Sequence, residues 1–218
     1  MELQPVLAAA CLLFTMGGLS PPGPRFDLCR IITAKSVDNI QLLRFLAIKA
    51  NNLCWLGYGC QKPDWMLIII NSIGATLQSL YILVYFYYSP AKRQVLLRVL
   101  TFLALLAAAY GYFFYFTDKD TLRSRVGLFC SSLTIMMYAS PLNDLAKVIR
   151  SRSTRCLSFP LAVTTFLASS CWTLYGQLVK DNYITVPNVP GIVTSVVQLW
   201  LFWRYAPGRD NPHRPLHV

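Results

Sequence analysis

The chain has 218 residues, of which 55% are hydrophobic and only 13% are charged, and its mean hydropathy is +0.46. Soluble domains carry about 25% charged residues, so this composition excludes an ordinary water-soluble protein and indicates an all-α membrane protein. The net charge of +11 would suggest a nucleic-acid partner for a soluble protein. In a membrane protein it is typical of basic cytoplasmic loops, so we expect a lipid bilayer and no nucleic acid as partners.

Seven membrane-spanning helices are predicted from the apolar runs. The first begins at Gln4, reaches Leu19 and continues through a proline-bent end towards Ile32. A signal peptide is the alternative for this segment, but no basic residues precede the apolar run and the only early charge is Glu2. The other six helices are predicted over residues 42–60, 65–88, 97–116, 126–148, 157–178 and 184–203.

The density of basic residues alternates between successive loops, which predicts the orientation of the chain. Lys and Arg concentrate around residues 25–35, 92–98, 147–155 and 204–214, whereas the alternate segments around residues 62, 119–125 and 180 hold fewer. Cytoplasmic loops carry the excess of Lys and Arg. We therefore expect a lumenal or extracellular N-terminus and a cytoplasmic C-terminus.

The sequence carries no signature of an enzyme or of a bound metal. Its seven cysteines have no CxxC spacing, so buried free thiols are favoured over zinc ligands or a disulfide framework. It also has no Gly-rich phosphate loop, HExxH motif or nucleophile elbow, and we predict neither catalysis nor a cofactor. No Asp or Glu lies in the middle of a predicted helix, so a proton- or sodium-coupling site lacks its usual ligand.

The chain contains an internal duplication at an offset of 117 residues. The stretch CWLGYGCQKPDWMLIIINSIG, residues 54–74, aligns with CWTLYGQLVKDNYITVPNVPG, residues 171–191. The matched residues are mostly Trp, Tyr, Asn, Asp, Pro and Gly rather than the Leu and Ile that any two apolar segments share. The identical pairs include Pro24/Pro141, Trp55/Trp172, Tyr58/Tyr175, Gly59/Gly176, Asp64/Asp181, Asn71/Asn188 and Gly74/Gly191.

A duplicated unit of three helices leaves one of the seven helices over, which predicts a 3+1+3 arrangement. Three helices end on the side opposite to where they began, so one extra crossing is needed before the copy starts in the same orientation. The two repeats are therefore parallel, related by an axis along the membrane normal. We predict the first repeat over 1–90, a linker with the fourth helix over 91–122, the second repeat over 123–205, and a cytoplasmic tail over 206–218.

These motifs resemble the SWEET family of sugar transporters. The resemblance rests on P-x-x-D-L-x-[RK] at the end of helix one, W-x-x-Y-G near the end of helix two and N-x-x-G in helix three, each present twice. The phrases NNLCWLGYG, ASPLNDLAKVI and VPGIVTS are similar to the vertebrate branch. The resemblance implies a facilitative, bidirectional monosaccharide uniporter that works by alternating access. It further implies the Golgi or plasma membrane as location, and assembly into a homo-oligomer.

Two tryptophans and two asparagines are the candidate substrate-binding residues: Trp55, Asn71, Trp172 and Asn188. An indole stacks on the C–H face of a sugar ring, and an amide offers a donor and an acceptor to neighbouring hydroxyls. About the repeat axis both pairs can converge on one cavity, and a tryptophan on each side indicates a glucose-sized pocket. The alternatives are an interfacial aromatic belt for the tryptophans and helix–helix hydrogen bonds for the asparagines. Trp65, Trp200 and Trp203 are assigned to the belt or to packing.

The resemblance also implies two gates. Tyr58 and Asp181 match the family's extracellular gate, with helix capping as the alternative role of Asp181. Pro24, Pro141 and Pro160 match three of four hinge prolines near the cytoplasmic ends of helices, where a lost backbone hydrogen bond makes a hinge. The fourth proline position falls on Arg44, and Pro22 is the alternative counterpart of Pro24.

Two rival functions remain at this point: a seven-helix ligand-binding receptor and a non-transporting membrane scaffold. A receptor shares the number of helices but is not expected to show the duplication. A scaffold would tolerate replacement of the candidate pocket residues. Gly59 and Gly176 are predicted to permit close helix packing, and Lys49, a second unusual cation, has no functional assignment.

Overall fold

The computed structural model describes residue 10 and residues 24–38, 40–116, 118–151, 154 and 157–205. Apart from residue 10, the predicted first span over residues 4–19 lies outside these residues, as do the alternative hinge Pro22 and the predicted tail over 206–218. The described elements are all helical: α2 (Pro24–Ala34), α3 (Leu42–Gln61), α4 (Trp65–Tyr88), α5 (Lys92–Phe116), α6 (Lys119–Met137), α7 (Ala139–Ser151), α8 (Phe159–Leu178) and α9 (Asn182–Arg204).

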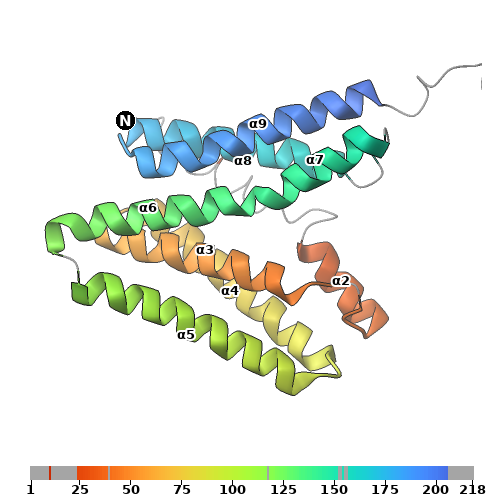
Figure 1. Ribbon diagram of the computed structural model, residues 1–218, viewed down its shortest axis with the longest axis horizontal. Helices are drawn as coiled ribbons and strands as arrows, with labels where there is room; N and C mark the ends of the chain where they lie inside the picture. Colours follow the sequence, from red (N-terminus) through yellow and green to blue (C-terminus); the bar gives the residue numbers. More distant parts are fainter. Residues whose placement is uncertain are drawn as a thin grey trace, which may run out of the picture.

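The duplication in the sequence is repeated in the helices. Moving α3 along the chain by 117 residues reproduces both ends of α8, and the same shift carries the start of α4 onto the start of α9. The packing repeats as well, because α3 lies against α4 just as α8 lies against α9. Figure 1 shows α6–α9 (green to blue) lying beside α2–α4 (red to yellow).

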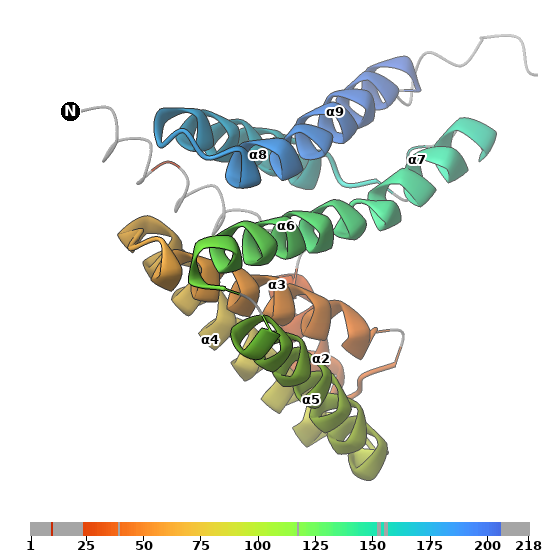
Figure 2. The ribbon, with the colours of Figure 1, turned by 60° about the vertical axis from the view of Figure 1, so that its left-hand side comes forward.

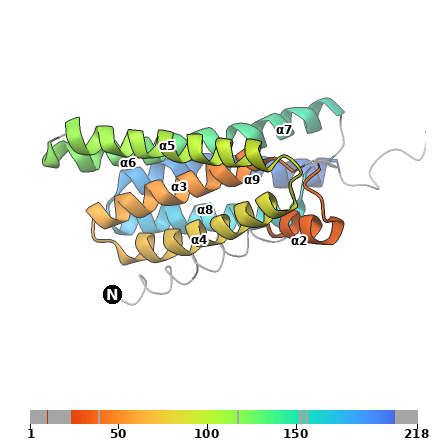
Figure 3. The ribbon, with the colours of Figure 1, turned by 90° about the horizontal axis from the view of Figure 1, so that it is seen from below.

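Helix α5 connects the two repeats and packs on α3, α4 and α6. Seen from below, it runs alongside these helices at one side of the molecule (Figure 3). Tyr110 attaches it to α3 by donating hydrogen bonds to the carbonyls of Leu53 and Cys54, at 3.2 and 3.0 Å. The ring fits against Gly57, where any Cβ would collide with it. The all-α, 3+1+3 arrangement predicted from the sequence is confirmed.

The predicted fifth helix over residues 126–148 is wrong in its continuity and in its start. Two helices, α6 and α7, meet at Tyr138, whose backbone N–H turns back to the carbonyls of Ile135 and Met136. Pro141 lies three residues after this break and cannot donate a backbone hydrogen bond to the preceding turn. The start was placed too late because the helix extends past its apolar part, through Arg125 and Arg123 to Lys119.

The shared core lies at one end of the molecule only. There, Tyr58 and Trp55 of α3 pack with Cys130 of α6, Tyr175 of α8 and Ile184 of α9. At the other end each repeat has a core of its own. The first is built from α2–α5 around Phe45 and Tyr81, and the second from Leu145, Val148 and Leu201. The two repeats are therefore joined at one end and diverge towards the other, as Figure 2 shows.

The surface of the described helices is apolar, as a bilayer requires. Among the described residues, three helices are long and apolar enough to cross a membrane by length and composition: α4, α9 and residues 92–113 of α5. Exposed aromatic residues mark the two ends of α4, with Trp65 at 74% and Tyr87 at 69% exposure. At 1.5 Å per residue they are about 33 Å apart, close to the ~30 Å thickness of a hydrocarbon core. Trp65, Trp200 and Trp203 are all exposed.

The prediction of buried cysteines is only partly correct. Among the described residues, Cys54 and Cys130 are fully buried, Cys171 is half-buried, and Cys29 and Cys60 are exposed. None of these five cysteines forms a disulfide. The exposed pair lies on helix faces that point outward, which hydropathy alone does not reveal.

Paired glycines bring the helices of each repeat close together, as predicted for Gly59 and Gly176. A Cβ on Gly59 would meet the Cβ of Leu67 at 2.9 Å, and one on Gly176 would collide with Thr185. Gly74 and Gly191 make the same kind of approach to Asn52 and Ser169, which are also related by the 117-residue shift. Each repeat is thus tightened at the same two places.

We expect Gly176→Ala to lower the melting temperature in detergent, because its Cβ overlaps the backbone nitrogen of Thr185 at 2.8 Å. Overpacking of this kind costs about 1–3 kcal/mol. Gly111→Ala in α5 is the control, since its Cβ meets nothing within 4 Å and alanine favours a helix. A lower melting temperature for Gly111→Ala than for Gly176→Ala would contradict this packing.

Candidate functional site

A cavity of about 130 Å³ lies between the two repeats, next to their shared core. A single water molecule needs about 10–15 Å³ of such space, so the cavity can take a small organic ligand. All four residues predicted to bind substrate line it, one from each of α3, α4, α8 and α9. The lining residues are Asn51, Asn52, Trp55, Leu67, Ile70, Asn71, Thr134, Trp172, Ile184 and Asn188.

The two tryptophans are held by the same contact in each repeat. Trp55 stands edge-on to Tyr58, with ring centroids 5.6 Å apart, and Trp172 stands edge-on to Tyr175 at 5.7 Å. The indole of Trp55 also donates a hydrogen bond from Nε1 to Thr134 Oγ1, at 3.0 Å. Trp55 is 7% exposed and Trp172 lines the cavity, so neither belongs to an outward-facing aromatic belt.

The two asparagines also share one arrangement. Nδ2 of Asn71 donates to the Leu67 carbonyl at 2.8 Å, and Nδ2 of Asn188 donates to the Ile184 carbonyl at 2.7 Å. Each of these bonds stays within its own helix, in contrast to the helix–helix bond considered as the alternative. A primary amide has two N–H donors and an acceptor oxygen, so each side chain keeps a donor and an acceptor for a ligand in the cavity.

Three polar cavity residues were missed by the sequence analysis: Asn51, Asn52 and Thr134. The Thr134 hydroxyl donates to Asn51 Oδ1 at 2.8 Å while it accepts the bond from Trp55, so the side chains of Trp55, Thr134 and Asn51 form one chain of hydrogen bonds. The duplication did not indicate Asn51, because the residue at the 117-residue offset is Ala168. The usable signal was the pair Asn51–Asn52 itself, since amides within an apolar span are costly unless they face protein, water or ligand.

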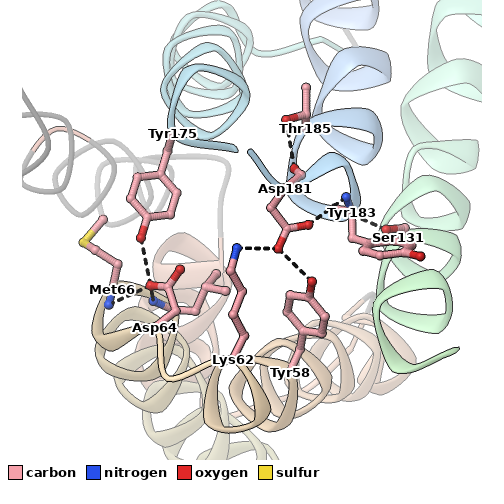
Figure 4. Close-up of polar contacts among 10 residues, drawn as sticks. Tyr58, Lys62, Asp64, Met66, Ser131, Tyr175, Asp181, Tyr183 and Thr185 are labelled. Carbon is pink, nitrogen blue, oxygen red and sulfur yellow. Dashed lines mark hydrogen bonds and ion pairs between the residues drawn. The ribbon is translucent and has the colours of Figure 1, made fainter. Parts of the chain in front are cut away.

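At its joined end the molecule is sealed by polar side chains from both repeats (Figure 4). Tyr58 donates its hydroxyl to Asp181 Oδ2 at 2.7 Å, and Lys62 binds the same oxygen at 2.7 Å. Asp181 also accepts from the backbone N–H of Tyr183 and so caps α9, in addition to its bond with Tyr58. Lys62 was not predicted, because its equivalent in the other repeat is Val179.

The charge on Asp181 is stabilised by its partners. Burial raises the pKa of this carboxyl, but the bonds from Lys62 and Tyr58 and the Lys62 charge outweigh it, and the pKa lies below its usual range. A carboxylate with a depressed pKa contributes its stabilisation at neutral pH and loses it only as the pH falls through that value. The Asp181 carboxyl therefore stays ionised across physiological pH.

A proline in α9 ties the second repeat together beside this seal. Pro187 has no backbone N–H, so it leaves the carbonyl of Tyr183, four residues earlier, without its helical donor. Ser131 of α6 donates its hydroxyl to that carbonyl at 2.8 Å. The start of α9, which carries Asp181, is thereby anchored to α6.

The three candidate hinge prolines all lie at helix starts. Pro24 is the first residue of α2, Pro160 the second residue of α8 and Pro141 the third residue of α7, directly after the break at Tyr138. At these places proline removes no internal hydrogen bond, and the neighbouring break supplies the bend. Their hinge role stays a prediction.

The two unusual cations of α3 occupy different environments. Arg44 is exposed near the start of the helix. Lys49 is half-buried and donates from Nζ to Ser79 Oγ at 2.8 Å, so it links α3 to α4 within the first repeat.

Together these features define a class of protein. A duplicated three-helix unit surrounds an uncharged cavity, with a polar seal at one end and separated repeats at the other, as in membrane transporters built from parallel repeats.

Comparisons with known proteins identify the family. The sequence model of the family described as "Sugar efflux transporter for intercellular exchange" matches residues 5–93 and 124–210. The chain is 51% identical over 217 residues to "Sugar transporter SWEET1" of Rattus norvegicus, covering 97% of this chain and 96% of that protein. It is 33% identical over 183 residues to the protein of the same name in Drosophila pseudoobscura pseudoobscura, covering 83% and 81%.

A solved structure of a eukaryotic SWEET transporter superimposes with a TM-score of 0.82 at 29% identity, covering 92% of this chain and 95% of that one. The chain therefore belongs to the SWEET family of multi-pass membrane transporters, and the prediction that it is not an enzyme is confirmed by that membership.

We expect Lys62→Met to lower the melting temperature most at neutral pH, where the ionised Asp181 carboxylate loses its cation in the variant. Below about pH 4, the ordinary range of a carboxyl, protonation of Asp181 removes the ion pair from the wild type as well, and the difference shrinks. Thermal unfolding of the wild type and of Lys62→Met, followed from about pH 8 to below pH 4, measures this difference in melting temperature. A difference that grows on acidification contradicts the assignment.

Proposed function

We propose that the chain is a facilitative, bidirectional uniporter for glucose-type monosaccharides. The observation that carries the proposal is the cavity between the repeats, where two indoles and two amides converge from equivalent positions. The indoles provide flat apolar surfaces for the C–H faces of a pyranose ring, and the amides provide donors and acceptors for its hydroxyls. Family membership supports a sugar as the substrate.

Uncoupled transport is supported by the chemistry of the cavity. None of its ten described lining residues is charged, whereas proton and sodium sites in membranes use carboxylates. The buried carboxylate of Asp181 lies at the seal and is already paired there with Lys62 and Tyr58. Sugar would then move down its own gradient in either direction.

Alternating access is supported by the unequal ends of the molecule. The repeats share a core and the Tyr58–Asp181 bond at one end, but have separate cores at the other. In the proposed cycle this is the state closed to the outside and open to the cytoplasm. Rocking of one repeat against the other would break the seal and bring the ends that carry Pro24, Pro141 and Pro160 together. A bound sugar shifts this equilibrium only by contacts that differ between the two states.

The proposal includes an orientation and a location. The end with Tyr58 and Asp181 faces the lumen or the exterior, the N-terminus lies on that side, and the C-terminus is cytoplasmic. The basic residues near the other end, such as Lys92 and Arg93 at the start of α5, support this orientation. We propose the Golgi or plasma membrane as the compartment, and a homo-oligomer as the assembly.

We expect Asn71→Ala and Asn188→Ala each to reduce glucose counterflow in proteoliposomes about 5- to 150-fold. Losing one amide leaves sugar hydroxyls unpaired in the cavity, at a cost of about 1–3 kcal/mol. Gln94→Ala removes an exposed amide from α5 and serves as the matched control. Wild-type counterflow in both asparagine variants contradicts the site.

We expect Trp55→Ala to weaken glucose binding about 2- to 12-fold, because it removes one stacking face worth about 0.5–1.5 kcal/mol. The cavity also widens, so a disaccharide should compete with labelled glucose in the variant and not in the wild type. Trp203→Ala, at an exposed position, is the control. Equal disaccharide competition in wild type and Trp55→Ala would argue against a glucose-sized pocket.

A further inference from the structure

A second polar bridge joins the two repeats at the sealed end. Tyr175 of α8 donates its hydroxyl to Asp64 Oδ1 at 2.8 Å (Figure 4). Both side chains are buried, with 4% and 8% exposure. The same Asp64 oxygen accepts from the backbone N–H groups of Met66 and Leu67, so this carboxylate caps α4.

This bridge is the internal counterpart of the Tyr58–Asp181 bond. The 117-residue shift converts Tyr58 into Tyr175 and Asp64 into Asp181. Tyr58 of the first repeat therefore donates to the carboxylate of the second repeat, and Tyr175 of the second repeat donates to the carboxylate of the first. In both cases the carboxylate caps the third helix of its own repeat.

We propose that the Asp64–Tyr175 bond is a second latch of the outer gate, so that the outer ends of the two repeats are held by two phenol–carboxylate bonds. The inference rests on the proposed alternating-access function. Two such bonds at different places restrict the relative rotation of the outer ends more than one bond does. Outward opening must separate α8 from the start of α4 as well as α3 from the start of α9.

The two latches are unequal. Asp181 binds Lys62 in addition to its phenol, whereas the equivalent of Lys62 beside the other latch is Val179. Among the described residues, the Asp64 carboxylate accepts its bonds from neutral donors, the Tyr175 hydroxyl and two backbone N–H groups. Bonds that join two charged groups are the stronger ones. Asp64–Tyr175 is accordingly the weaker latch, and opening begins on the side where α4 faces α8.

Spin labels on the outer ends of α3 and α8 test the proposal directly. Cys60 and Gln177 are exposed and related by the 117-residue shift, so the native Cys60 and a Gln177→Cys substitution report the separation of the repeats. Cys54 and Cys130 are fully buried and stay in place. The other cysteines are replaced by alanine: Cys11, Cys29, Cys156 and Cys171. Double electron–electron resonance in nanodiscs then gives the populations of short and long distances between the two spin labels.

Tyr175→Phe removes only the hydroxyl and keeps the ring against Trp172. We expect it to shift the ratio of open to closed populations at least about tenfold towards open, because the lost bond goes to a charged group. Tyr58→Phe should act in the same direction, and the double variant about a hundredfold if the latches are independent. Tyr183→Phe is the matched control, since its hydroxyl bonds Ser124 within the second repeat. It should leave the distances unchanged.

A gain-of-function variant tests the inequality. Val179→Lys places beside Asp64 the cation that Asp181 already has, and it should move the Tyr58→Phe variant back towards closed. If this substitution has no effect on that variant, the explanation of the unequal latches is wrong.

The outcomes separate this inference from the proposed function. If Tyr58→Phe opens the outer end and Tyr175→Phe gives the wild-type distances, the second latch is refuted while alternating access stands. If Tyr183→Phe opens the outer end as much as Tyr175→Phe does, the effect is general loosening and the latch is again refuted. If neither Tyr58→Phe nor Tyr175→Phe changes the distances, both the latch and the proposed outer gate fail.

Discussion

The structure depends on one electrostatic constraint, the pairing of a buried carboxylate in an apolar chain. Asp181 is 4% exposed, and burying such a charge without partners would cost several kcal/mol. Its partners Tyr58 and Lys62 come from the other repeat, so pairing the charge also joins the repeats. The shared core lies at the same end. At the opposite end each repeat buries its apolar side chains alone, and there the repeats are free to diverge.

The cavity follows from the duplication. Each repeat contributes one indole braced edge-on by a tyrosine and one amide that donates to a carbonyl of its own helix. These internal bonds satisfy part of each amide and hold its side chain in one orientation. The remaining donor and acceptor of each amide are held in place for a ligand. A repeated unit thus produces a site that neither copy contains by itself.

The positions at which the two repeats differ make the two sides of the seal and the two walls of the cavity unequal. Lys62 is matched by Val179, Asn51 by Ala168 and Pro187 by Ile70. The first difference strengthens one side of the seal, and the second adds a polar chain through Thr134 to one wall of the cavity. The third frees a carbonyl through which α6 anchors the start of α9. A perfectly symmetric protein would have none of these.

The sequence by itself determined the class, the duplication, most of the described helices and the four residues that meet in the cavity, because hydropathy and identities at a fixed offset are local properties of the chain. The break at Tyr138, the partner of Lys49 and the positions of Asn51, Thr134 and Lys62 were decided only by the tertiary structure. These residues are not repeated at the 117-residue offset or depend on where a helix bends. Which face of a helix meets which neighbour is fixed by rotation and packing in three dimensions, and no single segment encodes it.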